Sequence, residues 1–466
     1  MAWLGPTRAS VSCFGLLLAL FFLLISRNVS SEPYVYDEAD YMYAASLGFA
    51  ANWSDTPSIA VGDFVRAGLE RNGRQSLSER IRSGSDVLFY RHFHGPLFYY
   101  LLIPLAGRNE HLVRMALLAI PAVSLAVVYF GCLWIMPSAA LLAAVLFLTS
   151  YSVIGSTEVA PHQLFALCSL ASLTLLLKAT ASSGRGSESA RYWYGAVIAA
   201  GLAFCTLEIA LLLLVTLAIC CFVERDRWRV DRRFLAKSLA LFLATVLLVW
   251  PAAILRLSFL KAYLVVAYLS MLRAPWGHAG FVEIWRARII ASPLEWILIL
   301  VGMVMWFRNR RRNIYPLGVF AVLALAATVR VLSGSPRYSL PFMPVLDMLA
   351  GLALVPFLGP MRRPASLAVV ALAVAGLYGS AWYRAAHQPH NPNPRSAAVV
   401  SYIHQNGLKN KIILAPQADL PTLHYYFPRM QLRGYYGPSP AASDRLGFAA
   451  DAILRAGKGS LTPSKP

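Results

Sequence analysis

Long apolar runs separated by short polar stretches make up most of this chain. A first run extends from Val11 to Ser26, and further runs follow at about 111–134, 138–155, 162–179, 192–223, 235–257, 292–307, 314–332, 338–358 and 364–383. A helix needs roughly 20 apolar residues to cross a bilayer, and these runs approach or exceed that length. The pattern therefore predicts an all-α polytopic membrane protein.

The first apolar run has features of both a signal peptide and a membrane helix. It follows Arg8, as the apolar part of a signal peptide would, but no small-x-small cleavage site comes after it. We therefore expect an uncleaved helix whose amino end lies inside the cell.

Composition supports a membrane location. Hydrophobic residues make up 58% of the 466 residues and charged residues only 14%, which is far too apolar for a soluble protein of this length. The net charge of +20 could indicate a nucleic-acid partner, but the lysines and arginines fall in short clusters between the apolar runs. Such clusters are typical of cytoplasmic loops. We interpret the charge as topology, with a smaller contribution from binding membrane-lipid phosphates, and expect no nucleic-acid partner.

The basic clusters decide which segments cross the membrane. They are Lys178 with Arg185 and Arg191, Arg225 to Lys237, Arg308 to Arg312, and Arg362 with Arg363. All four fall on the cytoplasmic side if residues 94–107 lie in the interface and residues 192–223 form a hairpin of two short spans. This solution has about 11 spans of about 20 residues each. We place them in a bacterial cytoplasmic (inner) membrane.

Most polar residues at the membrane borders then lie on the outer, periplasmic face. They are Asp37, Glu38, His92, His94, Glu158, His162, Glu208, Arg337 and Tyr338. Ionisable groups at membrane depth are costly and usually functional. Two of them also fit ordinary roles: Glu208, at the hairpin tip, fits a buried hydrogen-bonded group, and His162 fits a helix cap.

Three carboxylates stand close together just after the first apolar run. Asp37, Glu38 and Asp40 lie among four tyrosines between positions 34 and 43, in a chain with only 22 acidic residues. Partial desolvation at a membrane border can raise the pKa of a carboxylate and make it a general base. The alternative is a solvated helix start, because acidic residues stabilise the positive end of a helix dipole.

The chain divides into two parts. Residues 1–384 form the membrane domain, whose outer loop, residues 27–110, contains one or two short amphipathic helices between Arg66 and Arg82. Residues 385–466 form a small periplasmic α/β appendage and a disordered tail. In the appendage the pattern predicts helices at 396–406 and 419–427 and strands at 411–415 and 430–436.

Other kinds of site are not indicated. All six cysteines lie in apolar runs without CxxC spacing, so we expect neither disulfides nor a cysteine metal site. The sequence has no GxxxxGK[ST] motif and no GxGxxG after a predicted strand. An enzyme acting on the outer face would therefore need a substrate delivered in the membrane.

Four short motifs follow one another on the predicted outer face. They are Asp37-Glu38, His94-Gly-Pro-Leu97, Gly201-Leu-Ala-Phe-Cys-Thr-Leu-Glu208 and Arg337-Tyr-Ser-Leu-Pro-Phe-Met-Pro344. Their order resembles the GT-C-type integral membrane glycosyltransferases, in particular the protein O-mannosyltransferases and the bacterial lipid A aminoarabinose transferase. Those proteins carry an Asp-Glu pair, a His/Lys-Pro-Pro-Leu motif, a Gly-Leu-Ala-x-x-Thr-Lys turn and an Arg-Tyr-x-x-Pro-x-x-Pro motif.

The resemblance implies a GT-C fold and transfer of a sugar, with inversion, from a polyprenyl-phosphate donor to a lipid, glycan or protein acceptor. Asp37 would act as the base, while Glu38 would position the acceptor hydroxyl or, with His92, help to hold a candidate divalent cation; no cofactor is otherwise implied. The donor phosphate would be bound by His94, Arg91, Arg337 and Tyr338. Acceptor or accessory roles would fall to Asp40, Tyr41, Glu158, His162 and Glu208.

The chain departs from these motifs at two positions. Gly95 replaces the first proline, and Leu207 stands where the relatives often carry lysine. The phosphate contact of that lysine would then come from Arg91, His92 or His94.

Two other classes of protein remain as alternatives. A transporter or flippase of lipid-linked sugars would also need outward cations and about 11 spans. Transporters tend to show pseudo-symmetric repeats and mid-membrane charges, whereas here no repeat is evident and the acidic residues lie at one border. A non-enzymatic membrane scaffold would leave the three carboxylates unexplained.

Overall fold

The computed structural model describes most of the chain. The described residues are 7–35, 37–53, 58–60, 88–90, 94–182, 187–228, 230–257, 259–261, 263–264, 267, 281–309, 314–331, 336–355, 364–387, 394–416, 419–435 and 452–453. The predicted amphipathic helices between Arg66 and Arg82 lie outside these residues. So do Arg91 and His92.

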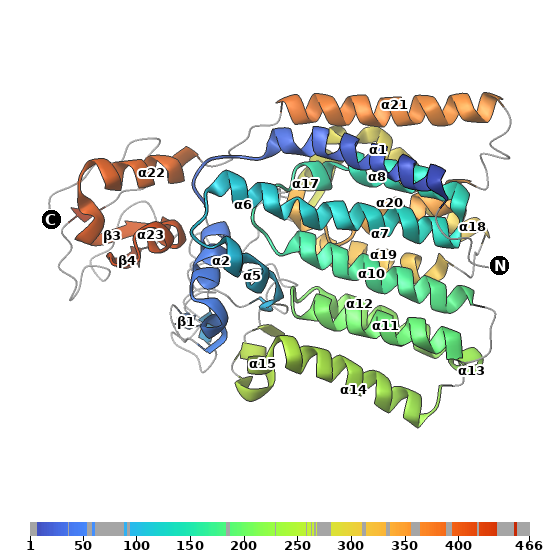
Figure 1. The fold of residues 1–466 in the computed structure, drawn as a ribbon, viewed down its shortest axis with the longest axis horizontal. Helices are drawn as coiled ribbons and strands as arrows, with labels where there is room; N and C mark the ends of the chain where they lie inside the picture. Colours follow the sequence, from blue (N-terminus) through green and yellow to red (C-terminus); the bar gives the residue numbers. More distant parts are fainter. Residues whose placement is uncertain are drawn as a thin grey trace.

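A bundle of roughly parallel helices forms the larger part of the molecule, as predicted (Figure 1). The long helices are α1 (Arg8–Ile25), α7 (Ala119–Ile135), α10 (His162–Ala181), α11 (Ser187–Phe204), α14 (Arg232–Val249), α18 (Pro293–Asn309), α19 (Tyr315–Val331) and α21 (Pro364–His387). Shorter helices between them include α6 (Glu110–Leu117), α8 (Ala140–Thr149), α9 (Tyr151–Ile154), α12 (Ala210–Val223), α13 (Arg225–Trp228), α15 (Pro251–Leu255), α17 (Phe281–Ala291) and α20 (Met343–Leu354).

Several helices have the length and composition of membrane spans. Among the described residues three helical stretches qualify, Arg8–Asn28, Glu110–Ile135 and His162–Ala181. A fourth qualifies if Trp285–Ala291 and Pro293–Arg308, which meet at a 106° bend, form one span. Shorter apolar helices add Pro137–Thr149, Ala210–Val223, Tyr315–Ala327 and Met343–Leu354. The count of about 11 spans stays a prediction.

The hairpin predicted from the charge pattern is present, whereas the interfacial position predicted for residues 94–107 stays a prediction. Residues 192–223 form a hairpin, in which α11 and α12 are joined by the turn that contains Glu208. Residues 94–107 form only the one-turn-and-a-half helix α5 (Leu97–Leu102) and the short 3-10 helix η3 (Ile103–Leu105), which together are too short to span a bilayer.

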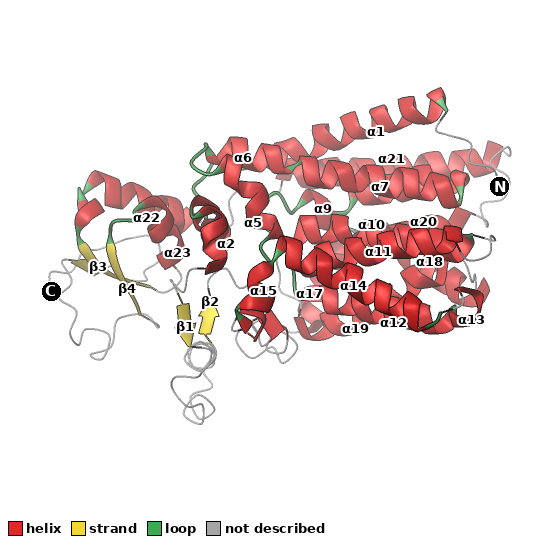
Figure 2. Ribbon diagram, turned by 60° about the horizontal axis from the view of Figure 1, so that its bottom comes forward, coloured by secondary structure: helices red, strands yellow, loops and turns green. Residues whose placement is uncertain are grey.

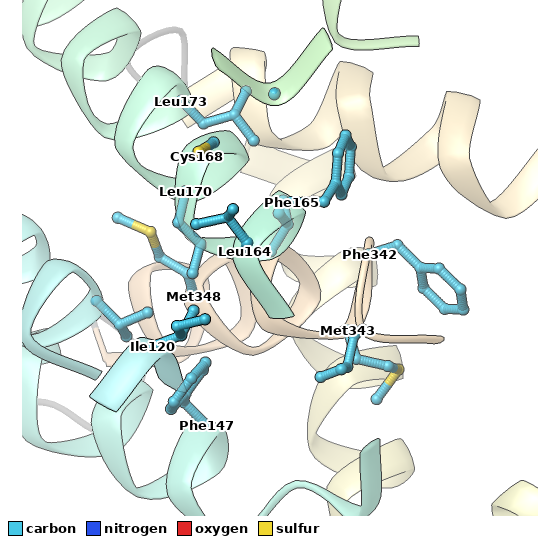
Figure 3. Close-up of a cluster of buried hydrophobic side chains, with 14 of the residues drawn as sticks. Ile120, Phe147, Leu164, Phe165, Cys168, Leu170, Leu173, Phe342, Met343 and Met348 are labelled. Carbon is cyan, nitrogen blue, oxygen red and sulfur yellow. The ribbon is translucent and has the colours of Figure 1, made fainter. Parts of the chain in front are cut away.

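The helices of the bundle pack around an apolar core. Phe147 of α8, Phe165 and Leu170 of α10, and Met343 and Met348 of α20 lie in one cluster of buried side chains (Figure 3). Small residues let backbones approach closely in this core: a Cβ added to Gly351 of α20 would lie 2.6 Å from the Cβ of Ala143 on α8. Close contact through small residues is typical of helix packing in membranes.

A small α/β domain lies at one end of the bundle (Figure 2). It consists of α22 (Pro394–Gln405), β3 (Ile412–Pro416), α23 (Leu420–Tyr426) and β4 (Gln431–Tyr435), which matches the predicted order of helices and strands. β3 pairs in parallel with β4 on one side and with β5 (Ala452–Ile453) on the other. The prediction of a disordered tail is therefore wrong at β5. The reason is that β3 is the central strand of the sheet, and its second edge offers backbone hydrogen bonds to the tail.

The outer loop contributes the remaining elements at this end. α2 (Asp37–Ser46) packs against α5 and against α23 of the small domain. Two short strands, β1 (Ser58–Ala60) and β2 (Leu88–Tyr90), pair antiparallel, with Ser58 opposite Tyr90. The helices α2 and α5 therefore lie between the helix bundle and the α/β domain (Figures 1 and 2).

Candidate active site

Asp37 is the first residue of α2 and the most accessible charged group of the site. The first turn of α2 contains Asp37, Glu38 and Asp40, where the positive end of the helix dipole stabilises negative charge. The side chain of Asp37 is 47% exposed, whereas that of Asp40 is half-buried. Asp37 is therefore the carboxylate of α2 that an incoming substrate can reach.

Arg337 brings three distant parts of the chain together. It lies on the 3-10 helix η6 (Pro336–Ser339). Its Nη2 atom lies 2.5 Å from Oδ2 of Asp37, and its Nη1 atom lies 3.4 Å from Oε2 of Glu158. Nη2 also donates to the hydroxyl of Tyr338 at 3.1 Å. One guanidinium thus binds two carboxylates that lie 300 and 179 residues earlier in the sequence.

The surroundings of Arg337 preserve its positive charge. Its side chain is only 12% exposed. Burial by itself lowers the pKa of the guanidinium, but the charges of Glu158 and Asp37 more than offset this effect and raise the pKa well above its ordinary value. A buried cation that stays charged is suited to binding an anionic oxygen in a dry site.

Glu38 has contacts that differ from those of its neighbour Asp37. Its two oxygens accept from Nε and Nη2 of Arg114, at 3.0 and 2.8 Å, in a buried bidentate pair. Oε1 also accepts from the backbone N–H of Val159 at 2.8 Å, and Oε2 from that of Val35 at 3.3 Å. These contacts anchor the start of α2. Through Glu38, the helix that carries Asp37 is joined to α6 and to the segment that carries Glu158.

Arg114 is the residue that sequence reasoning missed. It lies on α6 and is 4% exposed. In addition to Glu38 it binds the carbonyl oxygens of Ser30 and Glu32, at 3.0 and 2.6 Å. A signal was present, because Arg114 is a cation inside an apolar run, and such residues are usually paired and functional.

The segment that carries Glu158 is fixed along its length. The hydroxyl of Ser152 donates to that of Ser339 at 2.7 Å, which ties this segment directly to η6. Asn28 donates to the carbonyl of Ile154 at 3.1 Å, and Thr157 donates to the carbonyl of Asn28 at 2.7 Å. Both carboxylates that bind Arg337 therefore stand on backbone held by buried hydrogen bonds, which limits the movement of the site.

A second ion pair lies beside the first. Nδ1 of His94 lies 2.8 Å from Oε2 of Glu208, in the turn between α11 and α12. Burial tends to raise the pKa of Glu208, but the charge of His94 and its hydrogen bond have the larger effect, so the pKa lies below its ordinary value. The backbone N–H of Leu97 also donates to the carbonyl of Cys205 at 3.0 Å.

The departure at Gly95 has a steric reason. A Cβ added at Gly95 would lie 2.2 Å from the backbone carbon of Cys205, so no larger residue fits without moving α5 from the α11–α12 turn. Leu207, the other departure, is buried in the apolar core and presents no charge to the site. Of the three cations proposed to replace the missing lysine, His94 alone is described.

Two tyrosines contact the ion pairs: Tyr41 lies beside His94, and Tyr338 lies beside Arg337. The ring of Tyr41 lies 5.9 Å from that of His94, one turn of α2 after Asp37. Burial and then the nearby charge of Asp37 raise the pKa of Tyr41 well above its ordinary value, so its hydroxyl stays protonated. The ring of Tyr338 meets that of His162 edge to face at 5.2 Å. The imidazole Nδ1 of His162 is buried and has no hydrogen-bond partner among the described residues.

The described residues contain no group of three or more His, Cys, Asp or Glu side chains that could hold a metal ion. Glu38, one of the two predicted ligands, uses both carboxylate oxygens in the contacts to Arg114 and backbone N–H groups. His92, the other, lies outside the described part of the chain. The predicted cation stays a prediction.

Comparison with known proteins gives one family match. Residues 93–250 match the family model of dolichyl-phosphate-mannose-protein mannosyltransferase. This region includes α5, the segment with Glu158, and the α11–α12 hairpin with Glu208. No curated protein sequence matches the chain.

Solved structures share the fold over nearly the whole chain. ArnT from Cupriavidus metallidurans in the apo state superposes with a TM-score of 0.61 at 14% identity, covering 92% of this chain and 87% of that protein. The same protein bound to undecaprenyl phosphate gives 0.59 at 16% identity, covering 92% and 86%. The Archaeoglobus fulgidus oligosaccharyltransferase in complex with Zn and sulfate gives 0.58 at 15% identity, covering 90% of this chain but 61% of that one.

These findings agree with the resemblance seen in the four sequence motifs. At these identities the superpositions establish the fold, and the family match adds sequence similarity in the region that carries four of the outer-face acidic and histidine side chains, His94, Glu158, His162 and Glu208. The family match, together with the shared membrane fold, indicates a membrane glycosyltransferase.

Proposed function

We propose that the chain transfers a sugar, with inversion, from a polyprenyl-phosphate donor to a hydroxyl of a lipid, glycan or protein acceptor. The observation that carries this proposal is the contact of Arg337 with Asp37 and Glu158. The guanidinium of Arg337 is charged and can bind a phosphate, and the carboxylate of Asp37 is accessible and can accept a proton. Both residues belong to the motifs that the sequence analysis identifies.

Binding of the donor would change the partners of Arg337. A phosphate offers the guanidinium the same kind of oxygen atoms as a carboxylate does, and can bind it through two N–H groups. Asp37 is the more exposed of the two carboxylates and therefore the one that a phosphate can displace. Displacement frees Asp37 to accept a proton.

The transfer step then uses both groups. Asp37 takes the proton of the acceptor hydroxyl as its oxygen attacks the anomeric carbon of the sugar. The bond from that carbon to the phosphate oxygen breaks, and the polyprenyl phosphate leaves with the electron pair. Arg337, Tyr338 and His94 stabilise the negative charge that develops on the leaving phosphate. Attack opposite the leaving group inverts the anomeric centre.

The surrounding residues would have supporting roles. Glu158 keeps Arg337 in place when Asp37 is released, and Glu208 orients His94. Tyr41, Asp40 and His162 would have acceptor or accessory roles, and Glu38 anchors α2 through its contacts with Arg114. We place the site on the periplasmic face of a bacterial inner membrane, because α13, which carries Arg225 and Arg227 of one basic cluster, lies at the opposite end of the bundle from α2 (Figure 1).

A transfer assay tests the proposal. The purified chain, reconstituted in lipid bilayers, is incubated with a panel of radiolabelled polyprenyl-phosphate sugars and a membrane extract as the source of acceptors. Asp37→Asn keeps the shape of the side chain but cannot accept the proton, so we expect transfer to fall by about 10²- to 10⁴-fold. Asp226→Asn is the matched control, because Asp226 has a 95% exposed side chain on α13.

The outcomes separate the two functions. Normal transfer by Asp37→Asn would overturn the assignment of the base. Absence of transfer from every donor by the native chain, together with movement of lipid-linked sugar between leaflets, would favour the transporter instead.

A further inference from the structure

The α/β domain contacts the segment that leads into α2. The phenol oxygen of Tyr426, on α23, accepts the backbone N–H of Tyr34 at 2.8 Å and donates to Oε1 of Glu110 on α6 at 2.7 Å. One hydroxyl thereby joins the small domain, the outer loop and the helix bundle. Tyr34 lies 392 residues before Tyr426 and three residues before Asp37.

The backbone and the ring of Tyr34 both contact α23 of the small domain. Its carbonyl oxygen accepts the hydroxyl of Thr422 at 3.2 Å. Its ring meets that of Tyr425 edge to face, with 5.4 Å between centroids, and the residue is fully buried. Tyr34 lies outside any helix or strand. Its backbone N–H and carbonyl groups form their hydrogen bonds with the side chains of Tyr426 and Thr422 on α23 instead.

The bundle holds the same segment from the opposite side. Arg114 binds the carbonyl oxygens of Ser30 and Glu32 and the carboxylate of Glu38. The guanidinium of Arg114 also lies over the ring of Tyr34, 5.1 Å from its centroid. The chain that enters α2 is thus clamped between α6 and α23, and Asp37 stands at the end of the clamped segment.

The small domain has a core of its own that makes it a firm support. Val399 and Ile403 of α22, Ile413 of β3, and Leu423 and Phe427 around α23 are buried against one another. Tyr426 is the last residue of α23 and packs against this core. A rigid element that bonds to a catalytic segment limits how far the catalytic group can move.

We propose that the C-terminal domain is a positioning element of the active site and that Tyr426 is the residue through which it acts. This inference rests on the proposed role of Asp37. Tyr426 does not touch the reacting atoms: it sets where α2 begins, and through α2 the position of the Asp37 carboxylate relative to Arg337.

Tyr426→Phe is the most direct test, because it removes only the bridging hydroxyl. We expect kcat for transfer, expressed per donor-binding site, to fall about 3- to 10-fold, which corresponds to the loss of one or two ordinary hydrogen bonds. Expressing the rate per binding site removes the effect of any unfolded fraction. KM for the donor should stay unchanged, because the substitution removes none of the described contacts of Arg337 with Glu158 and Tyr338 or of His94 with Glu208.

Tyr402→Phe is the matched control. Tyr402 lies on α22 in the same domain, packs against the same core, and its hydroxyl makes no hydrogen bond in the described structure. The same chemical change at this position should leave both kcat and KM at their native values.

Hydrogen exchange gives a readout that does not depend on activity. In Tyr426→Phe the peptides that cover residues 29–46 should exchange faster, while those of β3 keep native protection; Tyr402→Phe should match the native chain throughout. If exchange changes in this way but the native chain transfers no sugar, the contact stands and the proposed function fails. If the native chain transfers sugar while Tyr426→Phe retains native kcat and native exchange, the positioning role is overturned.

Discussion

At the scale of residues, two adjacent acidic side chains have separate tasks. Asp37 is half exposed and shares Arg337 with Glu158, whereas Glu38 is buried and bound at both oxygens by Arg114. The sequence shows the carboxylate cluster and predicts a site there. The division of tasks does not, because it depends on where α6 and η6 place two arginines that lie 76 and 300 residues away.

Glu38→Gln should reduce stability far more than a typical surface change. It leaves Arg114 buried without its counter-charge, which costs about 3–5 kcal/mol when a buried pair is broken. We expect a lower midpoint of thermal unfolding in detergent and loss of transfer in proportion to the unfolded fraction. Glu32→Gln is the control, since Glu32 binds Arg114 only through its backbone carbonyl. Equal midpoints for the two variants would contradict the anchoring role.

The pair of His94 and Glu208 predicts how stability depends on pH. The pKa of Glu208 is lower in the folded protein than its ordinary value of 4.5. Its contribution is therefore present above that unfolded value and is lost as the pH falls through the lower folded pKa. The native chain should lose more stability than Glu208→Gln when denaturant unfolding is measured from pH 6 down to pH 3. Parallel losses in both proteins would exclude the pair as the cause.

At the scale of elements, the docking of α5 on the α11–α12 turn sets the position of His94. The sequence predicted both pieces correctly, because a run of a dozen apolar residues is too short to span and because the basic clusters required a hairpin. It could not predict their contact, which depends on a backbone hydrogen bond between Leu97 and Cys205 and on a glycine at the crossing.

Gly95→Ala tests that crossing. The added methyl group would lie within 2.2 Å of the Cys205 backbone, which cannot move out of the way as a flexible side chain could. We expect α5 to shift, the contact of His94 with Glu208 to lengthen, and KM for the donor to rise at least about tenfold, as a 1.4 kcal/mol loss of binding would produce. Gly379→Ala is the control, because a Cβ there meets nothing within 4 Å. An unchanged KM in Gly95→Ala would mean that His94 does not contribute to donor binding.

At the scale of the whole molecule, the arginines of α13 and the candidate active site lie at opposite ends of the helix bundle. The amino terminus and α13, with its arginines, lie at one end, and α2, α5 and the α/β domain lie at the other (Figure 1). Composition predicted this polarity because cytoplasmic loops are enriched in lysine and arginine. The all-α fold could be predicted because backbone polar groups in lipid must form hydrogen bonds within helices. Long apolar runs in a sequence therefore indicate helices.

Thiol labelling in intact cells tests the orientation. In a background in which all six cysteines are replaced, Arg429→Cys, exposed on the α/β domain, should react with a membrane-impermeant reagent. Asp226→Cys, exposed on α13, should react only after the cells are opened. The reverse pattern would place the site on the cytoplasmic face.

Under the proposed function, the contacts of Arg337 would also determine when the protein becomes active during its synthesis. Asp37 emerges from the ribosome 300 residues before the arginine that pairs with it. At about 5–20 residues per second, translation needs roughly 15–60 s to cover that distance. Throughout that interval the nascent chain already has its first helices in the lipid but has no assembled reaction centre. A truncated or stalled chain that ends before η6 would therefore accumulate as an inert membrane protein, unable to consume lipid-linked sugar in the cell.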